Sequence, residues 1–220
     1  MSSMPSESPI RRPLRPPYAA MFTTLAACLL FVGCSDEPTP AQSAFLEKIR
    51  TYRVEADAKP PAAVFQTIDR AMASAEPYDP ASDDSARVIA YKASLDERGD
   101  DGDPTSAYYA GRDRSRTCRW MASHGNEAYD IARCWQRALS AFKSASVAGL
   151  GAASEQIAVL LADGRAGKVS RPEVAAWYVT AASQYLKADD RNAASIAVSK
   201  ALTQAPDNAA ALRLQKTLTE

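Results

Sequence analysis

His124 is the only histidine of the chain, and it stands beside Gly125 in a segment typical of a turn. Catalysis by a Ser-His-Asp or Cys-His arrangement would have to use this imidazole as its base. No G-x-S-x-G sequence, which would present a serine nucleophile at a sharp turn, occurs in the chain. Zinc would need a better ligand set than one histidine and two distant cysteines. We therefore predict no catalytic residues, no metal site and no cofactor, and His124 is expected to be a solvated turn residue.

Cys118 and Cys134 are the only cysteines that follow residue 34. They fall on two consecutive expected helices, and their midpoint, residue 126, lies in the turn formed by residues 124–126. Positions equidistant from the turn of an antiparallel hairpin lie side by side, so the spacing suits a disulfide if the Cα atoms come within about 7 Å. Such a bond would contribute about 3 kcal/mol through the unfolded state. Two buried free thiols are the alternative.

The acidic segment from Asp96 to Asp103 contains the kind of oxygen ligand that calcium prefers. An EF-hand loop places ligands at alternate positions before a glycine and a glutamate at its end. Counted back from Gly102, the third position is Gly99 and the closing position is Tyr108, so the pattern fails. The segment is expected to be a solvated acidic loop between two helices.

Three arginines, Arg112, Arg116 and Arg119, share one face of an expected helix. Such a stripe could meet an anionic partner, for example lipopolysaccharide, an acidic polysaccharide or an acidic protein surface. Asp113 interrupts the stripe, and a charged face that is merely solvated is the alternative. Trp120 lies off the apolar face of the same helix, so it is a candidate for a contact surface. These four residues, the three arginines and Trp120, form the predicted binding surface.

The elements that must position these residues are helices. Apolar residues make up 46% of the chain, and many are alanine, which favours closely packed helices. Apolar side chains recur at helical spacing from Thr39 to the C-terminus, and no convincing strand pattern occurs. Prolines and capping residues divide this signal, and Ser170 with Glu173 makes a capping box. The expected helices are 39–59, 62–76, 82–97, 103–122 and one ending near 148, followed by further helices to residue 220. We predict an all-α fold.

Residues 153–182 carry a repeated pattern: apolar positions in one helix, a glycine at its end, and Trp-Tyr and Ala-Ala pairs in the next. The matching positions are Ala153, Ile157, Leu160, Leu161, Gly164, Val174, Trp177, Tyr178, Ala181 and Ala182. They resemble a Sel-one-like repeat, and Ala138, Phe142, Ala145 and Gly149 repeat the pattern one period earlier. Ala158, Ala166 and Ser170 depart from the family's usual residues.

Residues 175–208 resemble a tetratricopeptide unit, on Tyr178, Ala181, Ala182, Tyr185, Ala194, Val198, Ala201 and Pro206. The two resemblances together imply a right-handed solenoid of helical hairpins over residues 101–220. Residues 41–100 are helical by pattern but cannot be placed in phase, so they are divergent repeats or a capping subdomain.

The first 34 residues have the order of an export signal. Three arginines between residues 11 and 15 precede an apolar run from Tyr18 to Gly33, which ends at Cys34. The run is about 15 residues long, shorter than the ~20 that a spanning helix needs. A polar, proline-rich tether over residues 34–40 follows.

The stretch Phe31-Val32-Gly33-Cys34 resembles the bacterial lipobox, although Phe31 departs from the usual aliphatic residue. The resemblance implies that residues 1–33 are a lipoprotein signal peptide and that Cys34 is lipidated, which anchors the chain in the envelope facing the periplasm. Ser35 favours the outer over the inner membrane. Cys28 is a rival cleavage site, and ordinary secretion or an uncleaved anchor are further alternatives.

The charge balance of the remaining chain bears on its partners. Residues 35–220 hold 23 basic and 25 acidic residues, which argues against nucleic acid. Stacked hairpins commonly dock peptides or proteins, so we expect a non-enzymatic adaptor or assembly factor bound to an envelope protein. A carbohydrate- or peptidoglycan-associated lipoprotein that binds an anionic polymer through the arginines is the main alternative. An enzyme is a third, but the sequence supplies no nucleophile for it.

Overall fold

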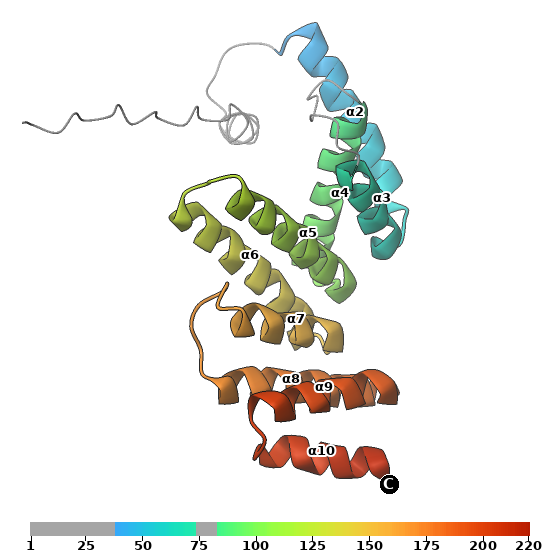
Figure 1. Ribbon diagram of the computed structural model, residues 1–220. Helices are drawn as coiled ribbons and strands as arrows, with labels where there is room; N and C mark the ends of the chain where they lie inside the picture. Colours follow the sequence, from blue (N-terminus) through green and yellow to red (C-terminus); the bar gives the residue numbers. More distant parts are fainter. Residues whose placement is uncertain (1–37, 74–82) are drawn as a thin grey trace, which may run out of the picture. The chain divides into compact units, whose positions relative to one another are not determined.

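The computed structural model describes residues 38–73 and 83–220, and within these ranges every regular element is a helix (Figure 1). The helices are α2 (Pro40–Asp57), α3 (Pro61–Ala73), α4 (Asp83–Asp100), α5 (Pro104–Ser123), α6 (Ala128–Val147), α7 (Gly151–Ala162), α8 (Arg171–Lys187), α9 (Arg191–Gln204) and α10 (Ala209–Thr219). The predicted all-α class is therefore confirmed for the described residues. Residues 1–41 and 42–220 are separate units, and the contacts below lie within the second.

Local sequence sets several of the helix ends. The Asp103 carboxylate accepts from the amides of Thr105 and Ser106, both at 3.2 Å, and so caps α5. At the start of α8 the predicted capping box is present, because the Glu173 carboxylate accepts from the Ser170 amide at 2.8 Å. These caps satisfy amides that the helices themselves leave without partners.

The acidic segment differs from the prediction. Helix α4 continues through it to Asp100, so only residues 101–103 separate α4 from α5. Gly99 explains the close turn, since a Cβ there would lie 2.8 Å from the Cα of Ala107 on α5. Asp96 also forms an ion pair with Arg114 of α5 at 2.9 Å. Part of the acidic segment is therefore helix held against α5, because backbone approach and charge pairing outweigh the turn preference of its aspartates and glycines.

Each helix from α3 to α9 packs on the helix that follows it, and α3 with α5, α4 with α6 and α8 with α10 are also in contact. Apolar clusters fill these contacts. One surrounds Phe142, Trp135 and Ile157 between α5, α6 and α7, and another surrounds Ile68, Tyr91 and Leu95. Alanine predominates where α7 to α10 meet, which brings the helix axes close.

The hairpin of α5 and α6 is closed by a covalent bond. The sulfurs of Cys118 and Cys134 lie 2.11 Å apart and the Cα atoms 5.6 Å apart, as the spacing about residue 126 predicts. Gly111 adds a close contact in the same hairpin, because a Cβ there would lie 2.8 Å from the Phe142 ring. Helix α5, which carries the predicted binding surface, is thus fixed against α6.

Candidate binding surface on helix α5

The three predicted arginines lie on α5 at positions i, i+4 and i+7, which places them along one side of the helix. Helix geometry spaces the first and the last by about 10 Å along the axis. Arg165, in the loop after α7, also acts electrostatically on Arg119. We refer to Arg112, Arg116, Arg119 and Arg165 together as the arginine face.

Arg116 serves the fold. Its guanidinium lies 2.6 Å from a carboxylate oxygen of Asp69 on α3 and 2.5 Å from one of Asp113 on α5. Asp113 is buried and also contacts the Lys92 ammonium at 3.2 Å. The aspartate that interrupts the stripe in sequence therefore neutralises one of its arginines, and Arg116 ties α3 to α5.

Arg112 is exposed, and its side chain is held by aromatic rings. The guanidinium carbon lies 4.6 Å from the ring centroid of Phe65 and 6.0 Å from that of Tyr108. A stacked guanidinium keeps its in-plane N–H groups free to donate. Arg112 forms no ion pair with any other described residue. It therefore presents an oriented cation to solvent.

Arg119 is also exposed, and within the described part of the chain it has no carboxylate partner either. Burial of part of its side chain lowers the pKa of Arg119, and the positive charges of Arg165, Arg116 and Arg112 lower that pKa further. The group remains charged at neutral pH because an arginine titrates far above it. The neighbouring arginines therefore contribute a positive potential at Arg119, in addition to the effect of burial.

Arg165 completes the arginine face from a different part of the chain. Its guanidinium carbon lies 5.2 Å from the ring centroid of Trp135 on α6, and it pairs with Asp163 at 3.3 Å. The sequence pattern could not predict that Arg165 lies near the three arginines of α5, because Arg165 is 46 positions from Arg119. The arginine face can donate paired N–H groups to carboxylates or phosphates, which is the geometry that guanidinium favours.

Trp120 lies beside the arginine face, at the end of the α5–α6 hairpin. Its side chain is 49% exposed, as its position off the apolar face predicts. The ring of His124 stacks on it with a centroid separation of 4.3 Å, and Nδ1 of His124 lies 2.8 Å from the Trp120 carbonyl oxygen. His124 is exposed in the turn, and the exposed Ser123 hydroxyl lies 3.0 Å from Nδ1 of its ring. No hydrogen bond joins the His124 ring to a carboxylate of the described residues.

A second polar centre was not foreseen from the sequence. Glu155 of α7 accepts from the Tyr185 hydroxyl of α8 at 2.9 Å and from the Lys200 ammonium of α9 at 2.5 Å. Burial raises the pKa of Tyr185, and its hydrogen bond to the Glu155 carboxylate raises it further. Because the three residues lie on three helices and satisfy one another, the centre joins these helices and leaves no free reactive group. No sequence spacing links them.

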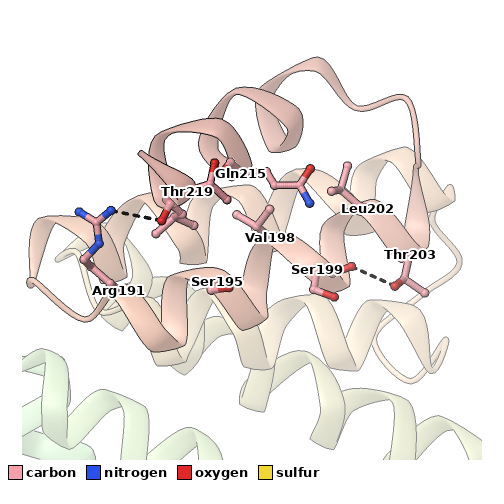
Figure 2. Close-up of a pocket in the computed structure, with 9 residues that line it drawn as sticks. Arg191, Ser195, Val198, Ser199, Leu202, Thr203, Gln215 and Thr219 are labelled. Carbon is pink, nitrogen blue, oxygen red and sulfur yellow. Dashed lines mark hydrogen bonds between the residues drawn. The ribbon is translucent and has the colours of Figure 1, made fainter.

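The groove between α9 and α10 is a cavity of about 530 Å³ (Figure 2). Val198, Leu202 and Leu218 supply its apolar lining, and apart from Arg191 the rest of the lining consists of hydroxyl and amide side chains. Arg191 stands at one end, where its guanidinium donates to the carbonyl oxygens of Thr217 at 3.2 Å and Leu218 at 3.3 Å. The one charged group of this lining therefore caps α10.

A smaller hollow of about 380 Å³ is lined by Arg53, Asp57, Glu97, Arg98 and Asp101. Its charges are largely satisfied within the fold: Arg53 pairs with both Asp57 and Glu97, and Arg98 with Asp103 at 3.5 Å. The side chains that line this hollow therefore form ion pairs that join α2 and α4.

Residues 38–73 and 83–220 contain no group of three or more histidine, cysteine or acidic side chains arranged to hold a metal ion. They also contain no helix that is both long and apolar enough to span a bilayer. The predicted lipidation site Cys34 lies outside the described residues.

Comparison with protein-family models gave no match to this chain, and comparisons with curated proteins and with solved structures gave none either.

Proposed function

We propose that the chain is a lipid-anchored helical-repeat adaptor of the bacterial envelope, which docks an acidic segment of a partner protein on the arginine face. The observation that carries the proposal is the pair Arg112 and Arg119, two exposed guanidiniums without described carboxylate partners. The partner would supply the missing carboxylates, with acidic residues spaced about 10 Å apart to reach both cations.

The order of helix contacts supports the repeat part of the proposal. Neighbours in sequence pack on one another from α3 to α10, as stacked hairpins require. Gly149 and Gly164 follow α6 and α7 with positive φ values of 95° and 67°, which a glycine adopts readily. These two positions match the closing glycines of the Sel-one-like pattern. A right-handed solenoid of such hairpins is the arrangement we propose.

The anchor part rests on sequence. A basic segment, a short apolar run and a lipobox-like stretch lead to Cys34, and acylation of this cysteine would hold α2 a few residues from a membrane. A disulfide between Cys118 and Cys134 fits the oxidising space outside the cytoplasm. We place the mature chain in the periplasm, on the outer membrane.

A protein partner is preferred to an anionic polymer because the cations of the arginine face are fixed. Phe65 and Tyr108 hold Arg112, and Trp135 holds Arg165, so the donors have set positions. A protein segment with carboxylates at set positions gains more binding free energy from fixed donors than a flexible polymer does, because less of the segment has to be ordered on binding.

Charge reversal tests the proposal in the source bacterium. The tagged full chain is crosslinked in the envelope and purified, and wild type is compared with the Arg112→Glu, Arg119→Glu double variant. The control double variant, Arg171→Glu with Arg213→Glu, has the same charge change at exposed positions on α8 and α10.

We expect a defined protein to co-purify with wild type and control. A hydrogen bond to a charged group contributes about 1.5–3 kcal/mol, so losing two should reduce recovery at least tenfold. Equal recovery with both double variants would contradict the proposal. Recovery of saccharide in place of protein would favour the anionic-polymer alternative.

A further inference from the structure

The end of the α5–α6 hairpin, residues 119–133, has few contacts with the rest of the fold (Figure 1). None of its residues is buried, and of its side chains Ile131 alone packs on the apolar cluster around Phe142. No ion pair joins it to another part of the described chain. A segment with so few buried contacts opens locally at low cost in free energy. We call residues 119–133 the hairpin end.

The disulfide closes the hairpin end and adjoins the arginine face on both sides. Cys118 directly precedes Arg119 on α5. Cys134 directly precedes Trp135 on α6, and the guanidinium carbon of Arg165 lies 5.2 Å from the centroid of that ring. The bond therefore fixes the part of α5 that carries Arg119 to the part of α6 that supports Arg165.

A reductant can reach this bond from one side. Cys118 is fully buried and Cys134 is partly exposed, so an attacking thiolate meets the Cys134 sulfur first. The Cys118 sulfur then leaves as an anion, which the positive charges of Arg119 and Arg165 favour. Accessible disulfides exchange with other thiols more readily than buried structural ones do.

We propose that the disulfide is a redox switch for the arginine face. The oxidised chain holds Arg119 and Arg165 in the arrangement that docks an acidic segment. In the reduced chain, opening of the hairpin end spreads past both cysteines, so Arg119 loses its place beside Arg165 and docking weakens. Arg112 keeps its position in both states, because Phe65 and Tyr108 hold it. The inference rests on the proposed function, since it regulates that same surface.

The reductant of the switch is a dithiol, which becomes a disulfide in the exchange. One of its thiolates attacks the Cys134 sulfur, a mixed disulfide forms, and the bond between the two cysteines breaks. The Cys118 sulfur leaves with the electron pair and takes up a proton. The second thiol of the reductant then displaces the Cys134 sulfur in the same way. Two electrons and two protons have then passed from the dithiol to the chain.

Binding of a fluorescein-labelled heptaglutamate peptide tests the proposal. The mature chain is purified with Cys34→Ser, so that Cys118 and Cys134 are its only cysteines. Fluorescence anisotropy gives the Kd of the oxidised chain, of the chain reduced with dithiothreitol and of the chain oxidised again. Loss of one charge-assisted contact should weaken binding about tenfold on reduction, and re-oxidation should restore it. The same Kd in both states would overturn the proposal.

Charge reversals show whether the redox response depends on Arg119. Arg119→Glu should bind the peptide weakly in both states, with no further weakening on reduction. Arg112→Glu should also bind weakly but keep the response. The control Arg171→Glu, at an exposed position on α8, should behave as wild type does. A full response in Arg119→Glu would overturn the proposal, because a general loss of structure would weaken binding whether or not Arg119 is present.

Hydrogen exchange measured by mass spectrometry reports the opening itself. At short labelling times, reduction should speed exchange at least about tenfold in peptides that span residues 115–137, because the opening can then pass both cysteines. Peptides from α8 should exchange equally in both states, since the rest of the chain stays folded. Unchanged exchange over residues 115–137, or an equal increase in α8, would overturn the switch.

Recovery of the envelope partner separates the switch from the proposed function. If peptide binding responds to reduction but no protein co-purifies with wild type, protein docking fails and the switch stands. If a protein co-purifies equally with the oxidised and the reduced chain, the switch fails and the docking stands. If the oxidised chain binds no heptaglutamate, the switch fails together with the arginine face.

Discussion

Reduction of the bond between Cys118 and Cys134 perturbs α5, the helix that carries Arg112, Arg116 and Arg119 of the arginine face. The two cysteines are 16 positions apart in sequence, and the chain-entropy relation for a loop of this length gives about 3 kcal/mol of stabilisation. For a domain of this size each kcal/mol corresponds to about 2–4 °C in Tm, so reduction should lower Tm by about 6–12 °C. Reductant leaves both side chains in place, so the cross-link alone is removed.

Thermal unfolding followed by circular dichroism, with and without reductant, measures this difference. The double variant Cys118→Ala, Cys134→Ala serves as the control, because its Tm should not respond to reductant. Thiol titration of the unfolded, unreduced protein should find neither of these cysteines free. If both cysteines titrated as free thiols, or if wild type had the same Tm with and without reductant, the disulfide would be contradicted and two buried thiols would be the alternative.

Two further predictions concern packing and pH. Replacing Gly111 with Ala should destabilise the protein by about 1–3 kcal/mol, although alanine favours helix, because the new Cβ would meet the Phe142 ring. Denaturant unfolding measures this loss of stability. Adding Phe142→Leu should recover part of it. A loss no smaller with Phe142→Leu present would argue against the contact. Burial, with the hydrogen bond to Glu155, raises the pKa of Tyr185 above its unfolded value of about 10. The contribution of Tyr185 to stability is therefore complete below about pH 10 and is lost as the pH rises towards the folded pKa. Between pH 9 and 11 the Tm should fall less in Tyr185→Phe than in wild type. Equal falls in Tm would contradict the raised pKa of Tyr185.

Helix positions could be predicted because local signals specify them. Prolines and caps separate the helices, and the expected first, fourth and fifth helices match α2, α5 and α6 closely. The disulfide geometry followed from the same reasoning, because two helices and one turn fix which positions face each other. The acidic segment was mispredicted as loop, since the close approach of Gly99 to Ala107 is a tertiary contact without a local signal.

The arginine face could be predicted only in part. Helical spacing placed Arg112, Arg116 and Arg119 on one side of α5, as the structure has them. Whether each charge is satisfied depends on residues far away in sequence: Asp69 removes Arg116 from the accessible cations, and Arg165 strengthens the field at Arg119. Such pairings depend on how the helices pack, which the sequence pattern does not specify.

Site-specific photo-crosslinking in the source cell tests whether the arginine face docks an acidic protein segment. A photo-crosslinking amino acid is placed in turn at the exposed position 123, one helical turn after Arg119, at position 199 in the α9–α10 groove and at position 187 at the end of α8. We expect one discrete protein adduct at position 123, with an acidic segment at the linkage identified by mass spectrometry, and no such adduct at positions 199 and 187. A protein adduct at position 199 without one at 123, or a saccharide adduct at 123, would contradict the proposed docking.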